Sequence, residues 1–371
     1  MRGAHPAGQV QRVVQGGSPR IVVIIPARNE AEAITATLAS VRGQTRAADR
    51  IIVVANNCTD ETGERAAVAG ADVLEMTDNP HMKAGALNHA LELVAPEYGD
   101  DDVVVVMDAD TTLRPQLFEL CLATLLADPR AGGVSSIFTG RRADNVLGVM
   151  QAMEFHRYKR DIARRGFRSF VLSGTASMFR LGALRDVQRA RLDGRLPHGG
   201  GSYYDITGRT EDNEITLALL TLGYACPAAD VDSVTDVMPT VGKLFRQRER
   251  WYNGALVNLR AYGLRLPPAL RWVYWRQQVG LALSTTVLLG MAAFWALAPV
   301  YGSVAVTWWW LAPLAVLLVE RLATVWSMGP RARAVAAAVI PEQLYGIFLT
   351  LTFAVACTNF ALGRQGRWHA T

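Results

Sequence analysis

Short apolar runs alternate with amphipathic segments over the N-terminal part of the chain. Buried strands are predicted at four runs rich in β-branched residues, Ile21–Ile25, Ile51–Ala55, Ala71–Glu75 and Val103–Met107. Helices are predicted between them, at Glu30–Arg42, from Thr59 or Asp60 to Ala69, and at Lys83–Val94. Buried strands that alternate with helices indicate an α/β fold, with a mostly parallel sheet covered on both faces. Sheets of this kind bind ligands beyond the carboxyl ends of their strands.

The middle of the chain has a less regular pattern. Strands are expected at Gly133–Gly140, Phe170–Arg180 and Gly223–Ala228, and Gly194–Gly208 has the composition of a loop. Asn145–Arg165 has the spacing of an amphipathic helix whose polar face is rich in Arg and Lys. Two interpretations of this helix stay open: it lies on a membrane surface, or it is an ordinary surface helix.

The C-terminal part of the chain is strongly apolar. No Asp, Glu, Lys or Arg occurs from Val279 to Val319, and none occurs from Gln343 to Gly363. Three segments are long enough to cross roughly 30 Å of hydrocarbon, namely Val279–Val300, Ser303–Trp326 and Leu344–Leu362. With three crossings, the basic groups after the second and the third would lie on opposite sides, against the positive-inside rule. Two and three crossings both stay open, with Ala334–Gln343 as a candidate re-entrant or interfacial segment.

Charge and cysteine content narrow the possible classes of protein. The chain has 371 residues, with 38 Lys and Arg, 33 Asp and Glu, and a formal net charge of +5. Basic residues gather between Gly242 and Arg276, before the first apolar segment, which suits a cytoplasmic position and attraction to anionic lipids. The sequence resembles no nucleic-acid-binding module. Its four widely spaced cysteines indicate neither a zinc ribbon nor a disulfide framework. Residues 1–20 are expected to form a flexible leader.

Two carboxylates follow the strongest strand signal. Asp108 and Asp110 come directly after Val103–Met107, and alternate residues at a strand end can direct both side chains toward one point. Paired carboxylates suit Mg²⁺ or Mn²⁺, whose remaining ligands would be phosphate oxygens and water. The position after a central strand favours a metal site over a chance D-x-D triplet.

Further polar groups follow the neighbouring strands. Pro26–Glu30 comes after the first strand, Asn56–Asp60 after the second, and Lys83 opens a helix near the same edge. A lysine and a helix N-terminus both favour a phosphate group. Each feature alone is most simply a capped loop or a solvated lysine. Together they predict a site for a nucleoside diphosphate with a metal ion.

A third group of acidic residues lies farther along the chain. Thr210, Glu211 and Asp212 precede the apolar segment Ile215–Leu222, which is predicted to be helical. The structural interpretation is a capping box, which the Thr-x-x-Asn spacing supports only in part. The functional interpretation is a general base at a helix N-terminus. A hydroxyl nucleophile has a very high pKa, so a positioned carboxylate must accept its proton as the new bond forms.

Seven ordered segments carry a family resemblance. They are IPARNE, NNCTDET, KAGALN, MDAD, LSGTASMFR, TED and the Q-x-x-R-W pattern of Gln247, Arg250 and Trp251. In this order they resemble the family 2 inverting glycosyltransferases with a GT-A fold, above all the membrane-integrated hyaluronan, chitin, cellulose and poly-N-acetylglucosamine synthases. The resemblance implies a Rossmann-like GT-A domain at residues 21–254, a basic interfacial segment at 255–277 and a membrane domain at 278–371.

The resemblance also implies roles for individual residues. It places the nucleotide and its diphosphate at Pro26, Arg28, Glu30, Asn56, Asp60, Lys83, Asp108, Gln247, Arg250 and Trp251. It implies metal ligation by Asp108 and Asp110, and catalysis by Asp212 as the base with Glu211 and Arg250. Ser173, Gly174, Thr175 and Trp251 are expected at the acceptor sugar. Asn56-Asn57 departs from the acidic pair of many relatives, which leaves the recognition of the nucleobase less defined.

The implied activity is transfer of a sugar, with inversion and with Mg²⁺ or Mn²⁺, from a nucleoside diphosphate donor to a hydroxyl acceptor. A UDP-sugar donor is expected, and Q-x-x-R-W favours polysaccharide or oligosaccharide synthesis. The expected partners are a glycan or lipid-linked acceptor, membrane lipids and further copies of the chain, without nucleic acid. The expected location is the cell membrane, multi-pass, with the catalytic domain on the cytoplasmic side. Two alternatives stay open: single transfer to a membrane-borne acceptor, as by a polyprenyl-phosphate sugar synthase, and a non-catalytic membrane scaffold.

Overall fold

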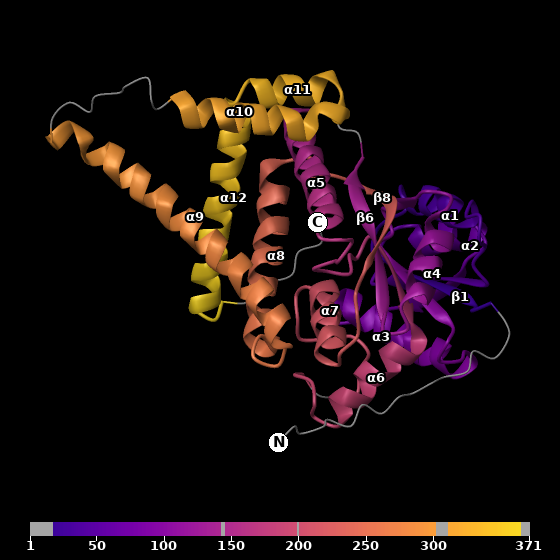
Figure 1. Cartoon of the computed structure of the whole chain (residues 1–371). Helices are drawn as coiled ribbons and strands as arrows, with labels where there is room; N and C mark the ends of the chain where they lie inside the picture. The colour runs from indigo at the N-terminus through magenta and orange to yellow at the C-terminus, as the bar shows by residue number, and fades with distance from the viewer. Residues whose placement is uncertain (1–17, 142–144, 199, 302–310, 365–371) are drawn as a thin grey trace.

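A computed structural model describes residues 18–141, 145–198, 200–301 and 311–364. Within these residues, eight strands form one mixed sheet in the order β3-β2-β1-β4-β7-β6-β8-β5 (Figure 1). The strands are β1 (Ile21–Ala27), β2 (Arg50–Asn56), β3 (Asp72–Met76), β4 (Val103–Met107), β5 (Thr112–Leu113), β6 (Gly133–Gly140), β7 (Ala176–Arg180) and β8 (Ala228–Thr235). β3, β2, β1 and β4 are parallel, whereas β7 is antiparallel to β4. The predicted α/β class is therefore correct. β6 is also parallel to β8, so four of the seven neighbouring strand pairs are parallel, but β7 and β5 are antiparallel to their neighbours and make the sheet mixed.

Alternate residues of the central strands pack into two separate hydrophobic cores, one on each face of the sheet. Val22 and Ile24 of β1 point to one face, which is covered by α3 (Met82–Val94), α6 (Leu181–Leu192) and α7 (Glu211–Thr221). Ile21 and Val23 point to the other, which is covered by α1 (Ile34–Arg42), α2 (Thr62–Val68) and α4 (Leu117–Ala127). Because side chains of a strand alternate between faces, a continuous apolar run fills both cores at once.

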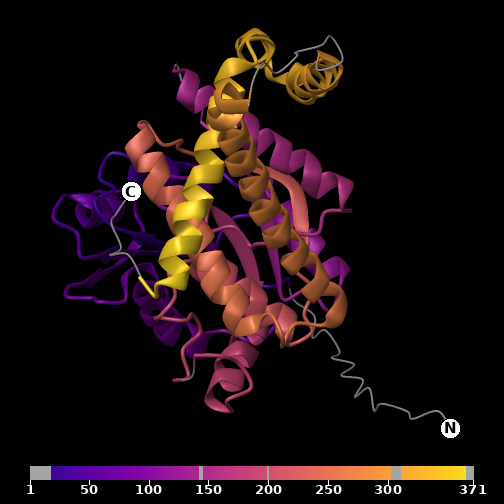
Figure 2. The same cartoon turned by 90° about the vertical axis from the view of Figure 1, so that its left-hand side faces the viewer.

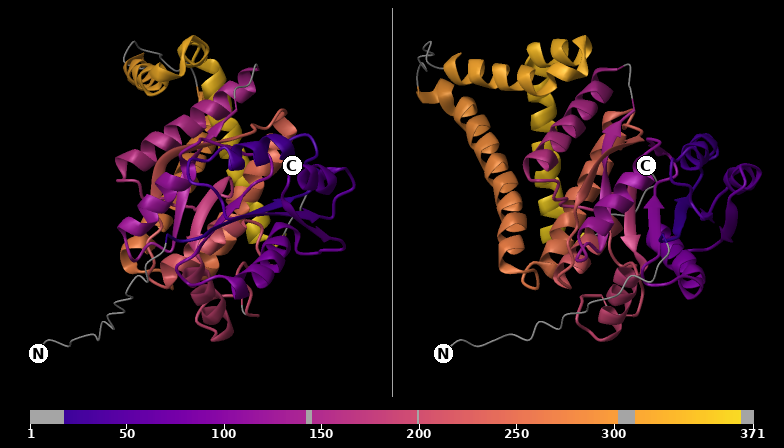
Figure 3. Two further views of the ribbon diagram at one scale, coloured as in Figure 1. Left: turned by 90° about the vertical axis from the view of Figure 1, so that its right-hand side faces the viewer. Right: turned by 45° about the vertical axis from the view of Figure 1, so that its right-hand side comes forward.

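A second group of helices lies beside the sheet. α5 (Val146–Arg164) packs on β6, and α8 (Val241–Tyr262) packs between α7 and α12 (Ile340–Ala361). α12 and α9 (Pro268–Tyr301) run lengthwise beside this body, as Figure 2 and the right panel of Figure 3 show. α10 (Leu311–Val325) and α11 (Pro330–Ala337) lie across one end of it. Two short 3-10 helices, η1 (Ala95–Glu97) and η3 (Trp326–Met328), complete the described elements.

Two helices among the described residues are long and apolar enough to cross a membrane by length and composition, at Pro268–Ala298 and Ile340–Ala361. The first contains the predicted segment Val279–Val300 except for its last two residues. The second contains the predicted segment Leu344–Leu362 except for its last residue. The predicted segment Ser303–Trp326 lies partly outside the described residues. Its described part is mostly α10, which lies across the end of the body near α11.

Several strand boundaries differ from the prediction, by one residue at β2 and β3 and by more elsewhere. β1 continues through Pro26 to Ala27, because the ladder with β2 still pairs Pro26 with Val54. β7 begins at Ala176 and not at Phe170, since the Ser173 hydroxyl accepts a hydrogen bond from the Thr175 amide and so competes with the sheet ladder. Gly223–Ala228 is not a strand. The strand begins at Ala228, after Gly223 at φ +90° and Pro227, which has no amide hydrogen to donate.

Most predicted helices are present with shifted ends. α1 begins at Ile34 and not at Glu30, because Asn29 adopts a left-handed φ of 57° and the next residues form a turn. α2 begins at Thr62, with Glu61 at the N-cap position, and the Asp60 carboxylate accepts a hydrogen bond from the Thr62 amide at 3.1 Å. The predicted loop at Gly194–Gly208 contains no helix or strand among its described residues. The helix expected at Asn145–Arg165 is α5, where the Asn145 side chain accepts a hydrogen bond from the Gly148 amide at 2.7 Å.

Candidate active site

Several elements present polar side chains at one edge of the sheet. The parallel strands β1 and β4 end there with Glu30 and with Asp108 and Asp110. The loop before the antiparallel strand β7 reaches the same edge with Ser173 and Gly174. α3 and α7 begin there. Charged groups that are far apart in the sequence therefore meet at the edge where open α/β sheets bind ligands.

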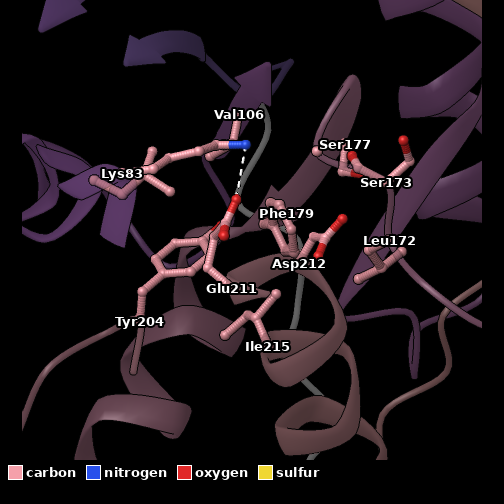
Figure 4. Close-up of a pocket in the computed structure, with 12 residues that line it drawn as sticks. Lys83, Val106, Leu172, Ser173, Ser177, Phe179, Tyr204, Glu211, Asp212 and Ile215 are labelled. Carbon is pink, nitrogen blue, oxygen red and sulfur yellow. Dashed lines mark hydrogen bonds and ion pairs between the residues drawn. The ribbon is translucent and has the colours of Figure 1, made fainter. Parts of the chain in front are cut away.

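Lys83 holds two acidic residues together at this edge. Its Nζ atom lies 2.6 Å from Asp108 Oδ1 and 2.8 Å from Glu211 Oε1, and Figure 4 shows the contact with Glu211 across the pocket. Burial opposes the charge on Lys83, but Asp108 and Glu211 outweigh it and raise the pKa of the amine. Burial likewise opposes the charge on Glu211, yet Lys83 and Arg250 hold the pKa of its carboxyl below the usual value. This pair is ionised at neutral pH.

Asp212 lines the same pocket but is in a different electrostatic state. Burial, followed by the neighbouring Glu211 charge, raises the pKa of Asp212 to about 6. Its Oδ1 atom accepts a hydrogen bond from the Asn213 amide at 2.7 Å, and Figure 4 shows its carboxylate on the side of Ser173 and Leu172. A carboxylate with this pKa is deprotonated at pH 7 and more basic than an ordinary aspartate, which suits a general base.

A second group of carboxylates lies beside Asp108. Burial, followed by the charges of Asp110 and Asp108, raises the pKa of Glu30 to about 7. Burial, followed by Asp108 and Asp236, raises the pKa of Asp110 to about 6. Like charges in a desolvated site repel, so a cation would stabilise this group.

The donor set fits a divalent cation bound in part by its substrate. Among the described residues, no three Asp, Glu, His or Cys side chains are close enough to form a complete metal site. Asp110 has a raised pKa, and its carboxylate accepts a weak hydrogen bond from Thr111 Oγ1 at 3.3 Å. Mg²⁺ and Mn²⁺ commonly use one or two carboxylates together with phosphate oxygens and water. Asp108 and Asp110 would hold such an ion.

Asp236, which directly follows β8, was not predicted as a site residue. It forms an ion pair with Arg141 Nε, and Arg141 also donates a hydrogen bond to the Asp110 carbonyl at 3.2 Å. Its charge raises the pKa of both Glu30 and Asp110. The only sequence signal for it was its place after a strand, and that strand was predicted in the wrong position.

The predicted acceptor loop lies against the charged pair. A Cβ atom at Gly174 would lie 2.8 Å from Lys83 Nζ and 3.5 Å from Asp108 Oδ2, so a side chain there would displace the lysine. Ser173 lines the pocket, and its Oγ atom lies 2.6 Å from Thr175 Oγ1. Thr175 Oγ1 in turn lies 3.1 Å from Ser233 Oγ. The loop therefore has hydroxyl groups at the pocket that are already ordered by one another.

The Q-x-x-R-W segment lies on α8. The charge of Arg250 helps to lower the pKa of Glu211, and it offsets part of the increase in the pKa of Asp212. Gln247 and Trp251 are instead organised by Arg248, a residue that the sequence analysis did not single out. Arg248 is buried, donates to Gln247 Oε1 at 2.8 Å and lies 4.3 Å from the Trp251 ring centroid. Its charge is balanced by Glu154 at 2.9 Å.

Two residues predicted to bind the nucleoside, Asn56 and Asp60, form hydrogen bonds within the protein. Asn56 is 4% exposed, donates to the Met82 carbonyl at 3.0 Å and accepts from Asn79 at 2.9 Å. Asp60 accepts hydrogen bonds from Thr62 and from the Ala31 amide, and these hold its pKa below the usual value although desolvation opposes them. Arg28 contacts Met82 Sδ at 3.4 Å. Asn56 thus orders the turn before α3, and Asp60 orders the turn after Glu30; their roles toward a nucleotide stay predictions.

A buried network fixes the start of α7. Arg191 of α6 donates two hydrogen bonds to Glu214, at 2.7 and 2.9 Å, and Tyr262 of α8 donates a third. Asn258 of α8 donates to Thr210 Oγ1 at 3.1 Å and to Asn213 Oδ1 at 2.9 Å. Glu211 and Asp212 lie between these two contacts, so packing against α6 and α8 determines where they point.

Comparisons with known proteins agree with this architecture. Residues 22–188 match the family model described as glycosyl transferase family 2. The chain is 25% identical over 243 residues to a poly-beta-1,6-N-acetyl-D-glucosamine synthase of Staphylococcus aureus (strain COL), a match that covers 63% of this chain and 54% of that one. It is 24% identical over 249 residues to the Staphylococcus epidermidis synthase, with the same coverage. The chain thus spans about half the length of these curated relatives.

A solved structure shares the fold over almost the whole chain. It is a mannosyltransferase from Pyrobaculum calidifontis in complex with GDP-Man and Mn²⁺, with a TM-score of 0.62 and 21% identity. The similarity covers 94% of this chain and 89% of that one. Residues 22–188 thus form a domain that matches glycosyl transferase family 2, and the structure has the GT-A fold.

Proposed function

We propose that the protein transfers a sugar from a nucleoside diphosphate donor to an acceptor hydroxyl, in one step with inversion at the anomeric carbon. The observation that carries this proposal is the pocket shared by Lys83, Glu211 and Asp212 beside Asp108 and Asp110. One carboxylate of this pocket is held charged by a lysine, and its neighbour is poised as a base. Transfer of a sugar to a hydroxyl needs both a positive charge near the leaving diphosphate and a base for the hydroxyl proton.

The chain's own residues supply three parts of the reaction. Lys83 and Arg250 place positive charge where the leaving diphosphate would gain negative charge. The oxygen of the acceptor hydroxyl attacks the anomeric carbon from the face opposite the leaving group. Asp212 accepts the proton of that hydroxyl as the new bond forms. Ser173 and Gly174 border the space open to the acceptor. A divalent cation held by Asp108 and Asp110 would neutralise further charge on the diphosphate.

The donor is proposed to be a UDP-sugar and the product a polysaccharide or oligosaccharide. Similarity to the synthases named above supports a polymer, as does the Q-x-x-R-W segment beside the pocket. Single transfer to a membrane-borne acceptor is the second candidate. Two described helices with the length and composition of a span are few for a polymer channel, because polar sugar groups need partners in hydrocarbon. We also propose that residues 21–254 form the catalytic domain, 255–277 an interfacial segment and 278–371 a membrane domain, at the cell membrane with the catalytic domain on the cytoplasmic side.

The test is release of nucleoside diphosphate from a panel of nucleotide sugars by the full chain in detergent. We expect release with one donor, its loss on chelation with EDTA and its recovery with Mn²⁺ or Mg²⁺. The Asp110→Asn variant is expected to show no recovery. Product length with labelled donor then separates the two candidates: chains that lengthen with time support polymer synthesis, and a product extended once supports single transfer. No release with any donor would contradict an enzymatic role.

A further inference from the structure

A second pocket lies between α5 and α9, away from the residues assigned above. Tyr158 and Asp161 of α5 line it together with Arg165, the C-cap residue of that helix, at a spacing that places them on one helix face. Val273, Arg276 and Gln277 line it from α9, also on one face. Phe170 closes it from the loop that leads to β7. The pocket is therefore built by two helices that face each other.

The charge of this pocket favours an anion. Arg165 Nη2 lies 2.7 Å from Asp161 Oδ2, and the guanidinium of Arg165 lies 4.1 Å from the Phe170 ring centroid. Arg276 is exposed and forms no ion pair with any residue that the structure describes. The lining thus contains two arginines and one aspartate, and that aspartate is paired with Arg165. Guanidinium groups match phosphate by paired hydrogen bonds, and the Gln277 amide offers a further donor.

The position of the pocket favours an anion that is carried by a lipid. It lies near the beginning of α9, within the candidate span Pro268–Ala298. Trp272 and Trp275 on the same turns are 67% and 42% exposed, and Val279, one turn farther along, is 60% exposed. Exposed tryptophans beside arginine at the start of an apolar helix are typical of the boundary between water and hydrocarbon. A phosphate bound to Arg276 would lie at the depth of lipid headgroups.

The pocket also lies close to the candidate active site. Phe170 lines it, and Leu172, Ser173 and Gly174 of the same loop line the catalytic pocket. Tyr158 has a pKa raised to about 12, mainly by burial, and the charge of Asp212 contributes to that increase. A ligand between α5 and α9 would therefore contact the loop that borders the acceptor side of the catalytic pocket.

We propose that Arg165 and Arg276 bind the phosphate group of a membrane lipid in the pocket between α5 and α9. This inference goes beyond the proposed transfer reaction and does not depend on it. The test accordingly measures binding and not turnover, so the two proposals can fail separately.

The experiment titrates the full chain, purified in dodecyl maltoside micelles, with dodecyl phosphate and with inorganic phosphate by calorimetry. We expect saturable binding of dodecyl phosphate that is at least about tenfold tighter than binding of inorganic phosphate. Arg276→Gln and Arg165→Gln are expected to weaken it about tenfold or more. Arg260→Gln on α8 and Arg164→Gln on α5 are the matched controls, because both are exposed, remove the same charge and lie outside the pocket.

Three results would overturn the proposal. One is the absence of saturable binding by the unmodified chain. Another is an equal loss in the pocket variants and in the controls, which would show general charge attraction. The third is inorganic phosphate binding as tightly as dodecyl phosphate, which would show a site for a free anion. Unchanged melting temperatures of Arg276→Gln and Arg165→Gln verify that the variants are folded, and the exposed Arg276 is the variant least able to disturb folding.

Discussion

Glu211 and Asp212 are neighbours in the chain, yet the pKa of Glu211 is lowered and the pKa of Asp212 is raised. Glu211 lies 2.8 Å from Lys83 Nζ, so its charge is compensated in place. Asp212 has no such ion pair among the described residues and carries the effect of burial and of the Glu211 charge. A difference in pKa between adjacent acids separates their roles. The first serves to hold Lys83, and the second is available to accept a proton.

Replacing Asp212 by Asn is the direct test of this separation. The amide is nearly the same size but cannot accept the proton, so we expect turnover to fall by roughly three orders of magnitude. The affinity for the nucleotide donor is expected to change less than about threefold, because Lys83 keeps both of its partners. Steady-state rates together with donor binding by calorimetry measure the two effects. Asp193→Asn, on the exposed surface, is the control. Normal turnover of Asp212→Asn would mean that the base is another residue.

The pH dependence of turnover follows from the same residue. Asp212 has a pKa raised to about 6, so it is protonated and unable to act as a base below that pH. We expect kcat/KM, which reports ionisation of the free enzyme, to fall about tenfold per pH unit below pH 6 and to level off above it. Initial rates in a constant-ionic-strength buffer series measure this limb. A limb near pH 4, the value of an ordinary aspartate, would argue against the buried environment of Asp212.

Gly174 offers a test of the position of Lys83. The Cβ atom of Gly174→Ala would lie 2.8 Å from Lys83 Nζ, so the amine must move away from Asp108 or Glu211. We expect the donor KM to rise roughly tenfold with a smaller change in melting temperature, since only the end of a flexible side chain is displaced. Gly280→Ala, where the structure leaves open space, is the control. An unchanged KM would indicate that Lys83 does not contact the donor.

At the scale of elements, the helix that carries the two acids is held by buried charge. Glu214 of α7 and Arg191 of α6 are both 0% exposed in their side chains and 2.7 Å apart. The Tyr262 hydroxyl of α8 also donates to Glu214. α8 in turn contacts α12, where Asn359 donates to Glu249 Oε1 at 3.0 Å. The helices beside the sheet therefore form one connected support for the start of α7.

Removing one partner of the buried pair is expected to be costly. Arg191→Met leaves the Glu214 carboxylate buried and without its cation, so we expect a loss of about 3–5 kcal/mol in the free energy of unfolding. The double variant Arg191→Met/Glu214→Leu is expected to recover part of it, because no unpaired charge then remains. Arg189→Met, which breaks an exposed pair on the same helix, is expected to cost less than about 1 kcal/mol. Thermal and denaturant unfolding measure all three. Equal losses in Arg191→Met and Arg189→Met would show that burial does not set the strength of this pair.

At the scale of the whole molecule, the two long apolar helices α9 and α12 run beside the α/β domain. Val279, Leu283 and Val287 of α9 are each more than half exposed. So much contiguous apolar surface is unfavourable in water and suits contact with lipid. α12 differs, because it also packs on α8 and so connects the apolar part to the helix that carries Arg250.

A fractionation experiment tests this arrangement. We expect the full chain to stay in the membrane pellet after extraction with alkaline carbonate, because helices that span the bilayer are not released by removing surface charge. A known peripheral protein and a known integral protein of the same cells serve as references. Release of the chain into the supernatant would show that α9 and α12 do not span the membrane.

Much of the fold could be predicted, and the reasons are local. Val103–Met107 reads as a buried strand because a run of β-branched residues fits the interior of a sheet and little else, and the structure confirms it residue for residue. The position of Asp108 and Asp110 at the strand end follows from that strand alone. β8 and Asp236 were missed because Ala228–Thr235 mixes acidic and apolar residues, and its place in the sheet depends on pairing with β6, far away in the sequence.

The sequence by itself determined the family resemblance, the strand-end acids and the apolar C-terminal segments, because each of these is written in consecutive residues or in short ordered spacings. Only the tertiary structure decided which charges meet. Lys83, Asp108 and Glu211 are separated by 25 and then by more than a hundred positions, and their contact depends on α3, β4 and α7 converging on one sheet edge. The same holds for Arg248 under Trp251 and for the pocket between α5 and α9. Electrostatic and packing energies depend on distance in space, and chain order does not determine that distance for residues on different elements.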